Sequence, residues 1–178
     1  MHRRSFLTAV ASAFSGLLPI PRLVRAAPRE RPTKPIPGSG EHLPLIGMGT
    51  WITFNVGSDP QAISERAEVL RAFFAAGGGM IDSSPMYGSA EAVVGQALAR
   101  LAGAPGLFAA TKVWTGSGAD GPREIAESQR LWGVERFDLL QVHNLLAWRE
   151  HLETLRAMKA DGRLRYLEHQ QRAAEAES

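Results

Sequence analysis

The stretch IDSSPMYGSAEAVVG, residues 81–95, decides the fold class. An apolar pair leads into Asp82, and Tyr87 follows five residues later, just before a run with helical spacing. This pattern is typical of a short buried strand, a polar loop and a helix. It places a carboxylate and a phenol at the end of a strand that is otherwise apolar. Polar groups in such a position suggest a role beyond packing.

Strand-like and helix-like segments alternate on both sides of this stretch. The expected strands are 45–51, 80–84, 107–114, 137–144 and 163–167, and the expected helices are 60–79, 89–103, 122–133 and 148–162. Such alternation predicts parallel strands joined by right-handed crossovers, in a (βα) barrel or a doubly wound sheet. No glycine-rich dinucleotide fingerprint follows the first strand, which favours the barrel. Ser89 is the expected helix cap, and His151 is expected on an exposed helix face.

The N-terminal residues resemble an export signal. Arg3 and Arg4 precede an apolar stretch over 6–20, and small residues follow at Ala26 and Ala27. The apolar stretch is shorter than the ~20 residues that span a bilayer, although an uncleaved membrane anchor is the alternative interpretation. The paired arginines before Ser-Phe-Leu resemble a twin-arginine signal, so we expect recognition by the export machinery and a periplasmic location.

Charge and cysteine content exclude several classes of function. Residues 1–35 hold seven basic residues and one acid, so the remainder carries a net −4 although the whole chain has +2. A mildly acidic body argues against nucleic acid as a partner. The absence of cysteine excludes disulfides and thiolate metal sites, and we expect no metal.

Ionisable side chains recur where the expected parallel strands end. Asp82 lies near the end of the second strand, with Tyr87 in the loop after it. Lys112 lies near the end of the third strand and His143 at the end of the fourth. Because the C-terminal ends of such strands meet at one site, we expect these four groups to lie together.

A phenol, an ammonium, a carboxylate and an imidazole suit proton transfer to a carbonyl oxygen. Lys112 is expected to lower the pKa of the Tyr87 phenol, and Asp82 to hold the lysine charged and in place. A neutral His143 could orient the oxygen. The set has no nucleophile, so it suits reduction by an external hydride donor.

The body of the chain resembles the aldo-keto reductase family. The stretch 81–95 matches that family's Asp-x4-Tyr-Gly-x2-Glu-x3-Gly signature, and GMGTW, TKVW and FDLLQVHN match its first, third and fourth strands. The resemblance covers roughly 36–167 in order and implies a (β/α)8 TIM barrel that reduces aldehydes and ketones with NADPH.

The same resemblance implies a role for each matching residue. Tyr87 would be the proton donor, Lys112 its partner, Asp82 the partner of Lys112, and His143 the residue that orients the carbonyl. Thr50, Trp51 and Asp82 match positions near the nicotinamide. Trp51 and Trp114 either line the substrate pocket or pack in the core.

The resemblance ends after RLRYL at 163–167. We therefore expect an export signal (1–26), a linker (27–42), an incomplete α/β barrel of about four βα units plus the start of a fifth strand (43–167), and a divergent polar tail (168–178). In the family, segments after strands five, seven and eight hold most of the cofactor, so we expect little or no turnover from these residues alone. The alternatives are a non-catalytic product of a frameshift or early stop, and a half-barrel that associates with a copy of itself through its open sheet edges.

Overall fold

The computed structural model describes residues 32–101, 103–104 and 106–169. The expected export signal and the residues after His169 lie outside these ranges. Within them, no helix has both the length and the apolar character that crossing a membrane requires.

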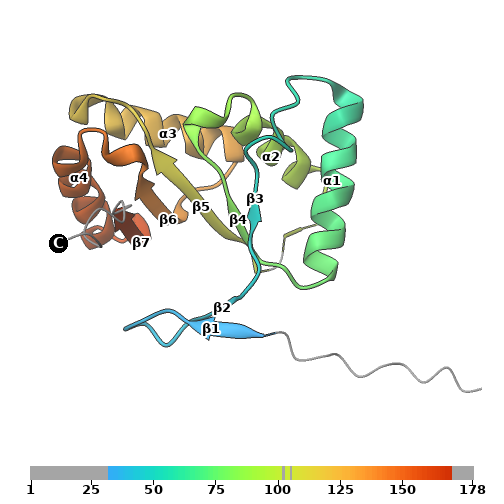
Figure 1. The fold of residues 1–178 in the computed structure, drawn as a ribbon, viewed down its shortest axis with the longest axis horizontal. Coiled ribbons are helices and arrows are strands. Elements are labelled where there is room, and N and C mark those ends of the chain that lie inside the picture. Colours follow the sequence, from blue (N-terminus) through green and yellow to red (C-terminus); the bar gives the residue numbers. More distant parts are fainter. Residues whose placement is uncertain (1–31, 102, 105, 170–178) are drawn as a thin grey trace, which may run out of the picture. The chain divides into compact units, whose positions relative to one another are not determined.

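A parallel sheet forms the centre of the described chain (Figure 1). Its strands, in spatial order, are β3 (Met48–Gly49), β4 (Met80–Asp82), β5 (Phe108–Val113), β6 (Phe137–Val142) and β7 (Leu164–His169). Each strand pairs in parallel with the next one along the chain. A doubly wound sheet reverses its strand order at a switch point, whereas a barrel does not. The sequential order therefore confirms the incomplete (β/α)8 barrel.

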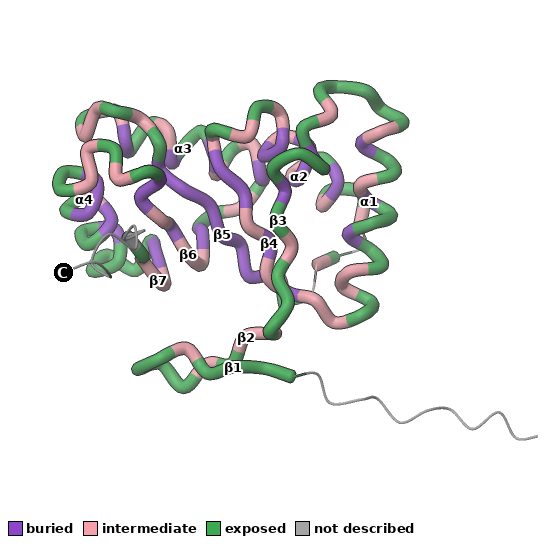
Figure 2. Tube along the Cα trace, in the orientation of Figure 1, coloured by how far each residue is buried: buried purple, intermediate pink, exposed green. Residues whose placement is uncertain are grey.

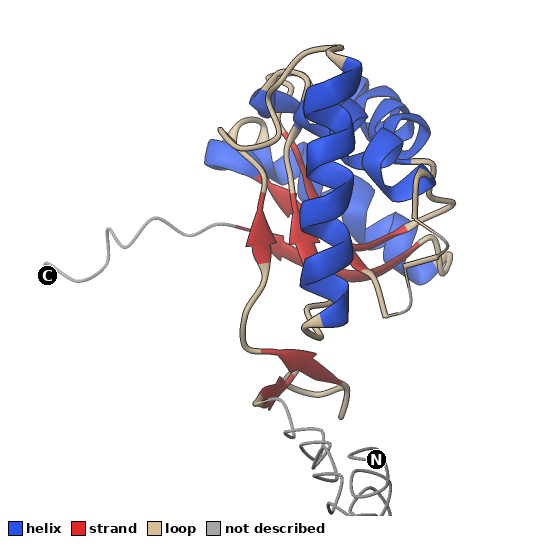
Figure 3. Cartoon of the chain, turned by 90° about the vertical axis from the view of Figure 1, so that its right-hand side faces the viewer, coloured by secondary structure: helices blue, strands red, loops and turns tan. Residues whose placement is uncertain are grey.

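The helices follow the strands in chain order. They are α1 (Pro60–Ala75), α2 (Ala90–Ala99), α3 (Gly121–Trp132) and α4 (Trp148–Ala160). In Figure 1 they run from α1, beside β3 and β4, to α4, beside β6 and β7. Figure 3 shows α1 from the β3 side, in front of the sheet. Asp59 caps α1 by accepting from the Gln61 amide at 2.9 Å, and Gly133, at φ 68°, ends α3 in the left-handed conformation.

The predicted cap of α2 is wrong. The Ser89 side chain makes no capping bond. Its hydroxyl donates to Asn55 Oδ1 at 3.0 Å and accepts from the Gly57 amide at 2.8 Å. Ser89 therefore ties the start of α2 to the loop after β3, because its hydroxyl oxygen accepts from the Gly57 amide instead of from an amide of the helix.

The hydrophobic core lies between the sheet and the helices (Figure 2). All six residues of β5 are buried, which makes it the central strand of the core. Fully buried side chains from both layers meet there, among them Leu70, Ile81, Val94, Leu140 and Leu155. A strand buried on both faces is expected where helices cover one side and barrel-facing residues the other.

The predicted linker is wrong over most of its length. β1 (Thr33–Pro35) and β2 (His42–Pro44) form an antiparallel hairpin there. In a two-stranded sheet each strand has a free edge, so prolines are tolerated where a central strand would exclude them. Glu41 in this hairpin accepts hydrogen bonds from Arg165 and from the Tyr166 hydroxyl of β7.

The predicted polar tail also begins too early, because β7 extends through Glu168 to His169. The backbone of these two residues pairs with β6, and Glu168 also accepts from the Gln141 side chain at 3.0 Å. Glu168 is exposed, and its polar side chain gave no sign of a buried strand.

Gly95→Ala should destabilise the protein by about 2–3 kcal/mol, because overpacking a close contact costs that much. Gly95 is the last residue of the 81–95 signature, and a Cβ there would lie 1.9 Å from the Leu131 carbonyl oxygen of α3. Urea unfolding followed by circular dichroism measures the difference. Gly116→Ala is the matched control, since its Cβ would meet nothing within 4 Å. Equal unfolding midpoints for both variants would contradict the close approach of α2 and α3.

Candidate active site

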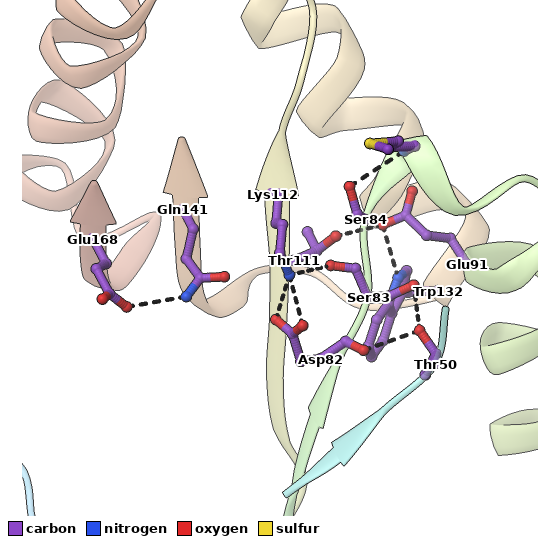
Figure 4. Close-up of polar contacts among 11 residues, drawn as sticks. Thr50, Asp82, Ser83, Ser84, Glu91, Thr111, Lys112, Trp132, Gln141 and Glu168 are labelled. Carbon is purple, nitrogen blue, oxygen red and sulfur yellow. Dashed lines mark hydrogen bonds and ion pairs between the residues drawn. The ribbon is translucent and has the colours of Figure 1, made fainter. Parts of the chain in front are cut away.

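The predicted site residues lie at the C-terminal ends of the parallel strands, and Figure 4 shows three of them, Thr50, Asp82 and Lys112. Asp82 ends β4, Lys112 lies in β5, and His143 directly follows β6. Tyr87 ends the short helix η1 (Pro85–Tyr87), which follows β4. Parallel strands bring these ends to one edge of the sheet, so residues as distant in sequence as Asp82 and His143 become neighbours.

Lys112 and Asp82 form the predicted ion pair. The Lys112 Nζ donates to both carboxylate oxygens of Asp82, at 2.7 and 2.6 Å, and to the Ser83 carbonyl at 2.9 Å. Lys112 is only 6% exposed, and these acceptors satisfy all three of its N–H groups. The ammonium is therefore held in one position at the strand ends.

Tyr87 lies against both this pair and His143. Its ring centroid is 5.5 Å from Lys112 Nζ and 6.1 Å from the His143 ring, which it meets edge-to-face at 86°. The four residues predicted to act together thus form one connected group, in which Lys112 pairs with Asp82 and Tyr87 lies between Lys112 and His143. Their catalytic roles stay a prediction.

The expected direction of the Tyr87 pKa is wrong. Burial, and then the negative charge of Asp82, raise the pKa of the Tyr87 phenol above its usual value. The charge of Lys112 is directly matched by Asp82, so the ammonium does not dominate the field at the phenol. Tyr87 is therefore protonated at neutral pH, which is the state that a proton donor requires.

His143 is uncharged at neutral pH. Burial, and then the nearby Lys112 charge, lower the pKa of its imidazole, while Asp82 partly opposes this. Among the described residues, His143 Nδ1 is buried without a hydrogen-bond partner. A neutral ring in this place can offer a hydrogen bond to an oxygen without adding charge.

The residues expected to hold the cofactor or the substrate differ in exposure. Thr50 is fully buried, and its hydroxyl contacts the Asp82 carbonyl and the Ser83 hydroxyl, both at 2.9 Å. Its side chain therefore holds the end of β4, and its place near the nicotinamide stays a prediction. Trp51 is 60% exposed and 6.4 Å from the Tyr87 ring, and Trp114 is 39% exposed. Both tryptophans therefore present apolar surface to solvent rather than packing in the core.

Glu91 is a buried carboxyl whose role the sequence did not reveal. It accepts from the Thr111 hydroxyl at 2.6 Å, the Ser128 hydroxyl at 2.9 Å and the Trp132 indole N–H at 3.1 Å. Burial raises the pKa of Glu91 even though these hydrogen bonds oppose the shift. Thr111 precedes Lys112 in β5, so Glu91 joins α2 and α3 to the strand that carries the lysine. The available signal was its position in the 81–95 signature, four residues before Gly95.

His151 is buried, not exposed as predicted. It is 1% exposed, and its Nε2 lies 2.8 Å from the Thr115 carbonyl oxygen. The spacing of His151, Leu155 and Met158 is that of one helix face, and all three are buried. The polarity of imidazole misled the assignment, whereas the helical spacing was the correct signal.

The site has no cluster of metal ligands. In the part of the chain that the structure describes, no three His, Asp or Glu side chains are placed to hold a metal ion. The charges at the strand ends are instead paired within the protein.

Comparison with known proteins agrees with this arrangement. The model of the Aldo/keto reductase family matches residues 45–167. An aldo-keto reductase from Klebsiella pneumoniae, solved in complex with NADPH, is 26% identical with a TM-score of 0.65, over 78% of this chain and 49% of that one. The glycerol dehydrogenase AKR11B4 from Gluconobacter oxydans is 26% identical with a TM-score of 0.68, over 80% of this chain and 49% of that one. A search of curated protein sequences gave no match.

The sequential parallel sheet, with Tyr87, Lys112, Asp82 and His143 at its strand ends, is the N-terminal part of a (β/α)8 barrel of the reductase type. The chain belongs to the aldo/keto reductase family. It spans about half the length of the solved structures that it matches.

The pKa of Glu91 predicts how stability depends on pH. Because the folded protein holds this pKa above the ordinary 4.5, its stabilising contribution is complete below that pH and is lost as the pH rises through the folded value. Urea midpoints of the parent should therefore fall relative to those of Glu91→Gln as the pH is raised from about 4.5 to neutrality. Glu127→Gln is the control, because Glu127 is exposed and Arg130 lowers its pKa. A constant difference between parent and Glu91→Gln at all pH values would contradict the burial of an ionisable carboxyl.

Proposed function

We propose that this chain serves the reduction of aldehydes or ketones to alcohols with NADPH. The observation that carries the proposal is the protonated phenol of Tyr87, 5.5 Å from an ammonium that is fully paired, and beside a neutral imidazole. Membership of the aldo/keto reductase family supports the reaction class, and the Klebsiella pneumoniae structure with NADPH supports the cofactor. Because the chain spans half of that relative, the activity of the whole protein stays a proposal here.

The residues of the site divide the work of the reaction. Bound NADPH would supply a hydride to the carbonyl carbon. Tyr87 gives its O–H proton to the carbonyl oxygen, so the alcohol forms and a phenolate remains until solvent returns the proton. The Lys112 charge opposes the repulsion between Asp82 and that phenolate, and Asp82 keeps Lys112 in place. His143 donates a hydrogen bond that orients the carbonyl oxygen.

The surface around Tyr87 fits one end of the cofactor. Trp51 is exposed and lies 6.4 Å from the Tyr87 ring, so a flat ring could stack there beside the proton donor. Asp82 is next to this place, whereas Thr50 is sealed beneath it. Trp51 and Asp82 are therefore the residues that would hold the nicotinamide end.

If the parent chain turns over, Tyr87→Phe should lower carbonyl-dependent NADPH oxidation by roughly 10²–10⁴-fold, which is the usual contribution of a positioned proton donor. NADPH affinity, measured by quenching of tryptophan fluorescence in the full chain, should stay within about twofold, because the lost hydroxyl acts only in the proton transfer. Tyr166→Phe is the matched control, because Tyr166 is the other tyrosine and its hydroxyl bonds to Glu41 in the hairpin.

The parent chain itself provides the decisive comparison. Saturable quenching together with turnover supports the proposal. A chain that binds no NADPH at millimolar concentration, or that oxidises it at the same rate without a carbonyl, contradicts the proposal and favours a non-catalytic protein.

A second candidate function is self-association without catalysis. Within the described residues, β3 and β7 each pair with a strand on one side only. Open edges of this kind pair readily with another chain. We expect sedimentation velocity of the full chain to show a dimer whose population rises with concentration. A single monomeric species that unfolds cooperatively would contradict this candidate.

A further inference from the structure

The loop after β5 carries one of the exposed tryptophans of the site. Trp114 directly follows the last residue of this strand and lies two residues beyond Lys112. Trp114 therefore lies at the same strand end as the ammonium. Its side chain is 39% exposed. Holding an exposed ring in one orientation costs conformational entropy, which other contacts must offset.

The backbone of this loop is held from α3 by one carboxylate. Glu124 Oε2 accepts from the Trp114 amide at 2.6 Å and from the Thr115 amide at 3.1 Å. Two successive amides thus converge on a single charged oxygen. Hydrogen bonds to an ionised acceptor are stronger than those between neutral groups, so the peptide unit between the two residues is fixed in position.

The same peptide segment is held from α4 by His151. A carbonyl oxygen only accepts, so the 2.8 Å contact with Thr115 requires that His151 Nε2 carries the proton. The ring is 1% exposed, and Gly121 packs so closely that a Cβ there would lie 2.7 Å from Nδ1. The imidazole cannot rotate without displacing this backbone, which makes it a rigid donor.

We propose that Glu124 and His151 are positioning residues that hold Trp114 at the mouth of the site and thereby set the width of the carbonyl pocket. Two helices fix three consecutive polar groups of one short loop, and neither side chain itself touches the reacting groups. The proposal deepens the proposed function, since the pocket matters only if a carbonyl substrate binds beside Tyr87. The positioning of Trp114 can nevertheless be measured without any turnover.

The test isolates the fluorescence of Trp114 in the full chain. Acrylamide quenching is measured for each variant with and without Trp114→Phe, and the difference reports the exposure of Trp114 alone. Glu124→Ala and His151→Leu should each raise the Trp114 quenching constant by about twofold or more, because the loop can then open locally. Glu124→Gln and His151→Gln should keep the Trp114 quenching constant closer to that of the parent. Glutamine can offer an oxygen in place of Glu124 and an N–H in place of His151.

Glu127→Ala is the matched control. Glu127 lies on the same helix and pairs with Arg130 at the surface, so its removal should leave Trp114 quenching unchanged. If Glu124→Ala or His151→Leu also leaves it unchanged while thermal unfolding shows a folded protein, the proposal is overturned. Equal changes in the alanine, leucine and glutamine variants overturn it too, because general loosening would then explain them.

Measurements of turnover distinguish the positioning of Trp114 from the proposed reductase function. With an active parent, Glu124→Ala should raise KM for a bulky aromatic aldehyde and for a small aliphatic one by different factors, while NADPH affinity stays within about twofold. An inactive parent in which Trp114 still becomes more exposed would support the positioning of Trp114 and contradict the reductase proposal. Unchanged selectivity in an active variant with a mobile Trp114 would overturn the link to pocket width.

Discussion

The buried ammonium of Lys112 is the constraint on which the arrangement of the strand ends depends. A charge taken out of water is tolerated only when it is paired and fully hydrogen-bonded. Lys112 meets that condition through Asp82 and the Ser83 carbonyl, all at the end of β4. The end of β4 must therefore lie beside β5 at a single register. Thr50 extends the constraint to β3, because its hydroxyl bonds to the Asp82 carbonyl.

The central strand β5 carries a polar group on each of its faces. Lys112 points to the ion pair at the strand ends, and the preceding Thr111 donates to Glu91 on the helix side (Figure 4). Alternation along a strand makes this division unavoidable. The signature 81–95 supplies Asp82 to one face and Glu91 to the other. The stretch therefore contributes both to the candidate active site and to the packing of the helices, because it contacts the two faces of the same strand.

The sequence was sufficient for the features that rest on local pattern. Alternating segments predicted the parallel strands, and strand-end positions predicted that Asp82 and Lys112 would meet. The direction of the Tyr87 pKa shift could not be predicted from the sequence. It depends on how deeply the phenol is buried and on the pairing of the Lys112 charge with Asp82. The hydrogen bond that Arg165 donates to Glu41 in the hairpin could not be predicted either, because two charged side chains leave no periodic pattern in the sequence. His151 was a different failure, because its helical spacing did indicate burial.

The contacts of Arg165 also govern the order in which this chain can fold. Arg165 bridges Glu41 and Asp138, and Glu41 precedes it by 124 residues. Loop closure over such a distance is slow, and the arginine does not exist until nearly the whole described chain has been made. At roughly 5–20 residues per second, the hairpin waits about 6–25 s on the ribosome for its partner strand. Among the described elements, the first to be synthesised is therefore one of the last to be anchored.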